Sequence, residues 1–363
     1  MSGVSKTQVH EKHVHKKNVL DPHAHEARRH GAHAPEMHAY ESLTPDVVLD
    51  ALSDLGLAVD GRLTALSSYE NRVYQAMLED DQAVVAKFYR PARWCDEAIQ
   101  EEHDFAAQLM AAEVPMVAPW VLQGRTLHHA SGFAFSVSPR RGGRSPELDD
   151  AEVLEWVGRF IARLHLVGEQ HSFKHRPELN VSTFGEDSRD WLMAHDKIAL
   201  DQQSAWVAVC NQALNLAQEA FEKHPAQHIR LHGDCHPGNI LWTPTDLPNG
   251  GPHFVDLDDA RTGPAIQDLW MLLSGDRQQR TQQLSILLEG YEQMRELNRQ
   301  ELALIEPLRT LRLIHYSAWL ARRQDDPAFV QNFSWFGTSD YWAGQVHMLE
   351  EQCEAMQEPL LVV

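Results

Sequence analysis

The sequence predicts an α+β protein with two lobes, a small β-rich lobe followed by a larger and mainly helical one. Two strand-like stretches, Arg72–Leu78 and Ala83–Tyr89, lie close together and are joined by a short acidic turn. Beyond residue 150, apolar residues recur mostly at helical spacing. Between the two halves, Ser138–Gly143 is rich in residues that end regular structure, and we expect the hinge there.

We expect three segments: a tail over residues 1–40, a small lobe over 41–138 and a large lobe over 139–363. The tail has few large apolar residues, so it cannot offset its chain entropy by burial, and we expect it to be mobile. The alternatives are weak binding of Zn²⁺ or Ni²⁺ and ordering against the folded body. Its histidines are His10, His13, His15, His23, His25, His30, His33 and His38.

The elements that we expect are bounded by local signals. Thr44 caps a helix that Pro45 opens and Gly56 ends. A β-rich island over Leu231–Val255 interrupts the helical half. Further strands are expected at Trp120–Leu122 and Phe133–Val137, and helices at Cys95–Ala111, Ala151–Leu166, Trp191–Phe221 and Leu284–Arg323.

Composition excludes several classes of protein. The formal charge is 32 − 52 = −20, and nucleic-acid binders need a basic surface, so we expect no nucleic-acid partner. Four scattered cysteines form no disulfide framework. No apolar run approaches the ~20 residues that cross a bilayer, and the N-terminus lacks the apolar stretch of a signal peptide. We therefore expect a cytoplasmic protein without a membrane partner.

The β-rich island carries the strongest chemical signal, His232-Gly-Asp-Cys-His-Pro-Gly-Asn239. Phosphoryl transfer needs a carboxylate that accepts the hydroxyl proton, oxygen ligands for Mg²⁺, and positive charge near the phosphates. Asp234 and Asn239 supply a base and a metal ligand on one loop, and Pro237-Gly238 supplies the turn between them.

Asp256 is expected to complete this metal site. Ile240–Trp242 and Phe254-Val255 are typical of two short strands of a hairpin, which would place Asp256 beside Asn239. Oxygen ligands with room left for water and phosphate suit Mg²⁺. The alternative, that these residues only form turns and caps, would hold for an isolated Asp-x-x-x-x-Asn pair. It fits poorly with the flanking His-Gly and the following strand.

These motifs resemble the catalytic loop and metal-binding segment of the protein-kinase-like superfamily, in the branch with aminoglycoside phosphotransferases, choline kinases and homoserine kinases. The sequence is most similar to the bacterial stress response kinase A proteins, over about residue 42 to the C-terminus. Three further segments carry this similarity: Ser68–Tyr74, Ala86–Pro91, where Ala replaces Val, and Asp256–Arg261.

The resemblance implies a bilobal kinase fold with ATP as co-substrate. It implies Asp234 as the catalytic base, and Asn239 and the catalytic Asp256 as holders of magnesium. The acceptors would be serine and threonine side chains of proteins, and a monomer is the family's usual state. It also implies that Asp268, which opens a helix, braces the catalytic loop through backbone hydrogen bonds.

The small lobe should supply the nucleotide-binding residues. Lys87 closes an apolar strand, as does the kinase lysine that binds the α- and β-phosphates of ATP. Val85 shares the strand face of Lys87 and would lie against the adenine. Glu102 is preferred over Glu101 as the partner of Lys87, because it shares a helix face with Ile99.

Other polar residues lie near these motifs. Ser68 lies in the loop expected to cover the phosphates. This loop has no glycine and so departs from the kinase pattern. Ser68 either contacts phosphate or belongs to a plain turn. Asp258 and Asp259 either touch the metal or are solvated, and we expect solvation. His236 is expected to pack within its loop.

Three functions fit the sequence. The first is a serine/threonine protein kinase of the stress-response type. The second is a small-molecule kinase acting on a choline-, homoserine- or aminoglycoside-like hydroxyl compound. The third, a pseudokinase that binds partners without turnover, is disfavoured because Lys87, Asp234, Asn239 and Asp256 are all present.

Overall fold

The computed structural model describes residues 40–324, 326, 329 and 332–363. Of the tail predicted over 1–40, only Tyr40 falls within this range. Tyr40 is buried, stacks on Phe133 with ring centroids 5.7 Å apart, and donates a hydrogen bond from its hydroxyl to the Glu70 carbonyl at 3.1 Å. Tyr40 thus belongs to the small-lobe core.

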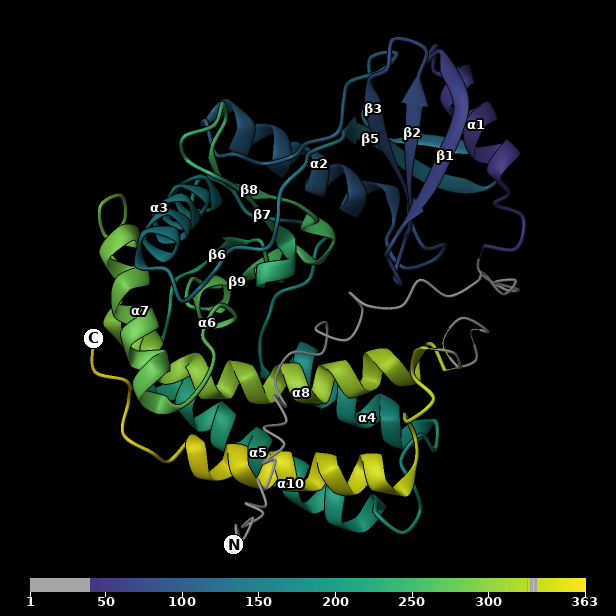
Figure 1. The fold of residues 1–363 in the computed structure, drawn as a ribbon. Helices are drawn as coiled ribbons and strands as arrows, with labels where there is room; N and C mark the ends of the chain where they lie inside the picture. Colours follow the sequence, from purple (N-terminus) through teal and green to yellow (C-terminus); the bar gives the residue numbers. More distant parts are fainter. Residues whose placement is uncertain (1–39, 325, 327–328, 330–331) are drawn as a thin grey trace, which may run out of the picture. The chain divides into compact units, whose positions relative to one another are not determined.

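The small lobe is a five-stranded sheet with one helix packed against it and a second helix leading to the large lobe (Figure 1). The strand order is β1-β2-β3-β5-β4, and all neighbouring strands are antiparallel. The elements are α1 (Pro45–Asp54), β1 (Val59–Leu66), β2 (Arg72–Leu78), β3 (Ala83–Phe88), α2 (Asp96–Ala111), β4 (His128–Ala130) and β5 (Phe133–Pro139).

Two predictions about this sheet were wrong. The strand β1 was missed because it is a largely exposed edge strand with Gly61 at φ 91°, so it lacks the apolar alternation of a buried strand. Trp120–Leu122 is not a strand of this sheet: Trp120 donates only one backbone hydrogen bond to Val137, and Leu122 then turns back to pair with Arg125. The sheet is completed by β4 instead.

The large lobe combines two small two-stranded sheets with a mainly helical body (Figure 1). Strand β6 pairs with β9, and β7 with β8. The elements are α3 (Ala151–Gly168), α4 (Asp187–Ala194), α5 (Gln203–Lys223), β6 (His228–Leu231), β7 (Ile240–Thr243), β8 (Gly251–Phe254), β9 (Arg261–Pro264), α6 (Gln267–Trp270), α7 (Arg277–Tyr291), α8 (Ile305–Ala321) and α10 (Ser339–Ala355).

Two long helices predicted here are each broken in the structure. The stretch Trp191–Phe221 divides into α4 and α5, because the chain turns at Asp196, which has a left-handed φ of 50°. The stretch Leu284–Arg323 divides into α7 and α8, with a 3₁₀ segment over Arg299–Leu304 before α8. Apolar periodicity does not reveal these turns, because apolar residues continue through them.

Helix α2 joins the two lobes through its side chains. Phe105 and Leu109 are fully buried and belong to the large-lobe core, which is separate from the small-lobe core formed by α1 and the sheet. Because α2 carries Glu102, this packing fixes that side chain relative to the large lobe.

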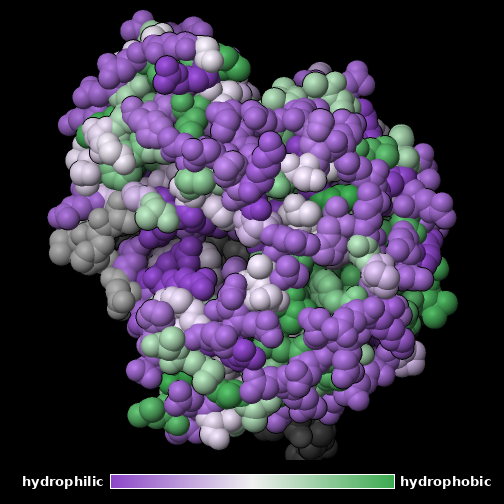
Figure 2. Space-filling view, turned by 180° about the vertical axis from the view of Figure 1, so that it is seen from behind, coloured by the Kyte–Doolittle hydropathy of each residue, from purple (hydrophilic) through white to green (hydrophobic). Residues whose placement is uncertain are grey.

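The face of the molecule in Figure 2 is mostly hydrophilic, with hydrophobic side chains scattered over it. No helix in the described part of the chain is long and apolar enough to cross a membrane.

Tyr40 provides a test of the small-lobe core. We expect Tyr40→Ala to lower the free energy of unfolding by about 3–4 kcal/mol, because it leaves a cavity beside Phe133. Tyr40→Phe should cost about 1 kcal/mol, since only the hydroxyl hydrogen bond is lost. Chemical denaturation measures both, with the exposed Leu200→Ala as control. A Tyr40→Ala variant as stable as this control would contradict the packing described.

Candidate active site

The loop over residues 232–239, which was predicted to be the catalytic loop, follows β6 and is held by one buried carboxylate. Asp268 is fully buried and accepts hydrogen bonds from the backbone N–H of His232 at 2.8 Å and of Gly233 at 2.9 Å. Gly233 has φ 84°, and a Cβ there would lie 2.2 Å from the Asp259 carbonyl oxygen, so this turn needs glycine. Asp268 therefore braces the loop as the family resemblance implies.

Asp234 follows this turn and is mostly buried. Its Oδ1 lies 2.7 Å from Nη1 of Arg312 on α8, and its Oδ2 lies 3.5 Å from Nε2 of His236. The Asn239 side-chain amide donates a 3.0 Å hydrogen bond to the Asp234 carbonyl, which closes the loop. Nδ1 of His236 accepts from the Gly238 N–H at 3.0 Å, so His236 packs within the loop.

The hairpin β7–β8 brings Asp256 beside Asn239. Ile240 pairs with Phe254, and the Val255 N–H donates to the Asn239 carbonyl at 3.0 Å. Asp256 has left-handed backbone angles, φ 63° and ψ 73°, and its side chain is about half exposed. Such a conformation is costly for a residue other than glycine and is typical of functional positions.

The oxygen atoms of Asn239 and Asp256 fit a divalent cation. The Asn239 amide nitrogen is engaged with Asp234, and among the described residues no hydrogen bond reaches its Oδ1. Oδ1 of Asp256 contacts Lys87, and within the part of the chain that the structure describes its Oδ2 accepts no hydrogen bond. The described residues contain no group of three His, Cys, Asp or Glu side chains able to hold a metal. A site with one carboxylate and one amide leaves the remaining positions to phosphate and water, as Mg²⁺ prefers.

Lys87 lies on β3 and faces three carboxylates. Its Nζ is 2.9 Å from Asp256, 3.2 Å from Glu102 and 3.3 Å from Asp258. Burial opposes its charge, but these carboxylates outweigh burial and raise the pKa of Lys87 well above its ordinary value. Val85 shares the face of Lys87, is half-buried and pairs with Ser138 at the start of the hinge.

The two candidate glutamates on α2 have different contacts. Glu102 bridges Lys87 and Arg176, with Oε2 at 2.9 Å from Nη2 of Arg176. Glu101 instead accepts hydrogen bonds from three consecutive backbone N–H groups that begin at Lys174. Glu102 is therefore the residue that pairs with Lys87 in the structure.

Asp258 and Asp259 were expected to be solvated, and this was wrong. Asp258 is 4% exposed and contacts Lys87 and Arg93, the latter at 2.6 Å. Asp259 contacts Arg93 and Arg261, both at 2.8 Å. Burial raises the pKa of Asp258, yet Arg93 and Lys87 outweigh it and hold that pKa below its ordinary value. The sequence gives no signal for this, because Arg93 lies in the other lobe.

The loop between β1 and β2 is anchored to the large lobe. The Tyr69 ring packs edge-on against Trp319 and Phe333, with centroids 5.5 and 5.1 Å away. Glu70 forms ion pairs with Arg90, Arg93 and Arg323, and accepts a 2.9 Å hydrogen bond from the Trp319 indole. Ser68 is half-buried in this loop, and in the described structure it makes no hydrogen bond to Lys87, Asp234 or Asp256.

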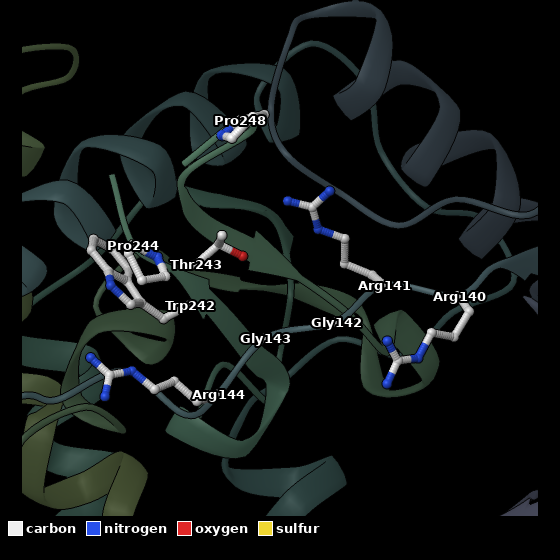
Figure 3. A pocket seen from close by; sticks show the side chains of 9 residues that line it. All are labelled: Arg140, Arg141, Gly142, Gly143, Arg144, Trp242, Thr243, Pro244 and Pro248. Carbon is white, nitrogen blue, oxygen red and sulfur yellow. The ribbon is translucent and has the colours of Figure 1, made fainter. Parts of the chain in front are cut away.

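A shallow pocket of about 740 Å³ lies at the segment after β5, where the hinge was predicted (Figure 3). Gly143 crosses close to β7, and a Cβ there would lie 2.8 Å from Cβ of Leu241. Arg141 donates to the Asn249 carbonyl in the β7–β8 turn at 2.8 Å. The pocket lies beside the C-terminal end of β5. At that end Pro139 pairs with Val84, whereas Lys87 pairs further back along β5 with Ser136. It is lined by Arg140, Arg141, Gly142, Gly143, Arg144, Trp242, Thr243, Pro244 and Pro248.

The structure thus brings Lys87, Glu102, Asn239 and Asp256 together around Asp234 and its loop, and leaves Ser68 without a recorded contact to them. Sequence analysis missed three arginines that contact site carboxylates: Arg93, Arg176 and Arg312. A single arginine on a helix or loop carries no pattern that marks it as a site residue.

Comparison with known proteins agrees with this geometry. The model of the phosphotransferase enzyme family matches residues 62–305. Stress response kinase A of Escherichia coli strain K12 is 45% identical over 322 residues, which cover 89% of this chain and 96% of that protein. The serine/threonine protein kinase RdoA of Salmonella typhimurium is 44% identical over the same shares of the two chains.

Solved structures share the fold at lower identity. An amicoumacin kinase in complex with AMP-PNP and Ca²⁺ has a TM-score of 0.67 at 20% identity, covering 88% of this chain and 96% of that chain. A microcompartment-associated aminopropanol kinase has a TM-score of 0.65 at 19% identity, covering 85% and 98%. The predicted kinase-like fold is therefore confirmed.

The predicted activity is confirmed at the level of the family. The chain is an ATP-dependent phosphotransferase, and its fold implies a divalent metal. With matches of this length and identity, the chain belongs to the phosphotransferase enzyme family and, within it, to the stress response kinase A proteins.

Proposed function

We propose that this protein is a Mg²⁺-dependent serine/threonine protein kinase in which Asp234 is the catalytic base. The observation that carries the proposal is the cluster in which Lys87 contacts Asp256 while Asn239 closes the loop of Asp234. A cation, two oxygen ligands and a carboxylate base within one site are the parts that phosphoryl transfer requires.

Each residue has a role in the proposed reaction. Lys87, held by Glu102, binds the α- and β-phosphates of ATP, and Val85 and the hinge accommodate the base. Asn239 and Asp256 would hold Mg²⁺, which neutralises charge on the phosphates when bound. Asp234 accepts the proton of the acceptor hydroxyl as its oxygen attacks the γ-phosphorus and ADP leaves.

The acceptor is proposed to be a serine or threonine side chain of a protein. Support comes from the 44% identity to a relative named as a serine/threonine protein kinase, along nearly the whole of both chains. The solved kinases named for small acceptors are at most 20% identical, so they support the fold and not the acceptor. The alternative acceptor is a small hydroxyl compound, and the first experiment distinguishes it from a protein acceptor.

We further propose a cytoplasmic monomer. All four cysteines are free, and Cys210, Cys235 and Cys353 are buried without forming a disulfide. This is the pattern expected in a reducing compartment.

The first prediction concerns Asp234. We expect Asp234→Asn to lower the rate of phosphate transfer from ATP to a generic basic protein by about 100-fold or more, because the base is lost, while ATP affinity stays within about threefold. Radiolabelled ATP measures transfer, and phosphoamino-acid analysis identifies the acceptor. A panel of amino alcohols and aminoglycosides is assayed in parallel.

Asp190→Asn is the matched control, because Asp190 lies on α4 and contacts Arg189 rather than the catalytic loop. Wild-type-like transfer by Asp234→Asn would falsify the assignment of the base. Transfer to a small compound alone would replace the protein acceptor by the alternative.

The second prediction concerns the metal. Removal of divalent ions with EDTA should abolish transfer, and Mg²⁺ should restore it. Asn239→Ala should raise the Mg²⁺ concentration that gives half-maximal activity by about tenfold or more, since one of two protein ligands is lost. Asn211→Ala, on the exposed face of α5, is the control. An unchanged Mg²⁺ requirement in Asn239→Ala would remove Asn239 from the metal site.

A further inference from the structure

The only side chains of the catalytic loop that can carry positive charge are histidines. Residues 232–239 contain neither lysine nor arginine. Phosphoryl transfer nevertheless spreads negative charge over the transferring group, and enzymes of this type place positive charge beside it. Any lysine or arginine beside Asp234 therefore comes from another segment of the chain.

The other cations near the site are already bound by carboxylates. Lys87 faces three of them on the small-lobe side. Arg93 pairs with Glu70, Asp258 and Asp259. Arg261 pairs with Asp259 and lies over the Phe184 ring. Arg261 also lies within electrostatic range of the Asp234 carboxylate, while its 2.8 Å ion pair is with Asp259.

Arg312 differs from these cations in its contacts. Its Nη1 lies 2.7 Å from Oδ1 of Asp234, and its side chain is 22% exposed. In the described structure it has no second ion pair and no hydrogen bond. A guanidinium has five N–H donors in a rigid fork, so most of them remain available to a second partner next to Asp234.

The helix holds Arg312 firmly in this place. Its neighbours Leu311 and Ile314 on α8 are at most 1% exposed, and α8 packs against α4, α5 and α10. The pairing also distinguishes the two carboxylate oxygens of Asp234, since Oδ1 is held by Arg312 while Oδ2 faces the His236 ring.

We propose that Arg312 is a catalytic residue of this kinase, which holds Oδ1 of Asp234 and donates its remaining N–H groups to the γ-phosphoryl oxygens during transfer. This inference rests on the proposed function. The acceptor O–H proton passes to Oδ2 of Asp234, the bond from acceptor oxygen to γ-phosphorus forms, and the bond to the β,γ-bridging oxygen breaks. ADP carries away the electron pair, and Arg312 remains protonated throughout.

The structure also suggests why the cation comes from α8. An arginine on a separate helix meets Asp234 only when α8 is packed against the catalytic loop, so charge stabilisation depends on an intact large lobe. A loop lysine would remain beside the base in any arrangement of the helices. Arg312 thus has both an orienting contact in the ground state and spare donors for the transition state.

The experiment compares Arg312→Gln, Arg312→Lys and Arg312→Ala with wild type. For Arg312→Gln we expect transfer to fall by about 100-fold or more, the usual loss when one preorganised donor is removed, with ATP affinity within about threefold. Arg312→Lys should retain more activity than Arg312→Gln, because a point charge remains. Added guanidinium ion at millimolar concentration should restore part of the activity of Arg312→Ala.

A binding measurement separates this inference from the proposed function. Calorimetry compares the affinity for ADP alone with that for ADP, Mg²⁺ and aluminium fluoride, which imitates the transferring phosphoryl group. Arg312→Gln should lose about tenfold or more of the affinity for the second complex and none for ADP. This holds even if no protein acceptor is phosphorylated, in which case only the proposed function fails.

The control is Arg322→Gln, on the exposed side just after α8, where the guanidinium lies over the Trp191 ring. It should behave as wild type in every assay. Thermal unfolding identifies any variant that fails to fold, and Arg312→Lys then serves as the test because it keeps a positive charge opposite Asp234. Wild-type transfer and wild-type affinity for the aluminium fluoride complex in Arg312→Gln would overturn the proposal.

Discussion

The active site depends on the need to pair three carboxylates that lie close together in the sequence, one of which is buried. After β8 the chain places Asp256, Asp258 and Asp259 within four residues, and Asp258 is almost fully buried. Unpaired charges at such a position would be strongly destabilising. Lys87 and Arg93 come from the small lobe to pair with them. The electrostatic requirement of one short segment therefore fixes how the two lobes meet at the site.

Other contacts across the lobes support the same arrangement. Helix α2 buries Phe105 and Leu109 in the large-lobe core, which places Glu102 opposite Lys87. The loop between β1 and β2, which contains no glycine, is tied to α8 and the following segment by Tyr69 and Glu70. The nucleotide side of the site is thus preorganised by packing as well as by charge, which lowers the reorganisation needed for transfer.

The comparison of prediction and structure shows where local patterns are sufficient. The strands β2, β3 and β5 and the hairpin β7–β8 have clear alternation or short-range turns, and the structure has them. The edge strand β1 was missed because exposure removes the apolar alternation. The adjacent Asp258 and Asp259 were wrongly expected to be solvated, because consecutive acidic residues usually are, and their partners lie far away in the sequence.

The sequence by itself determined that Asp234, Asn239 and Asp256, the proposed base and metal ligands, lie close together. Asp234 and Asn239 are five residues apart on one turn, and a single hairpin brings Asp256 to them, so short-range geometry sets their proximity. The helix face favoured Glu102 as the partner of Lys87, but only the tertiary structure showed that contact and the contact of Arg312 with Asp234. Those pairs join segments separated along the chain, and helix packing, which local sequence patterns do not encode, sets the distance between them.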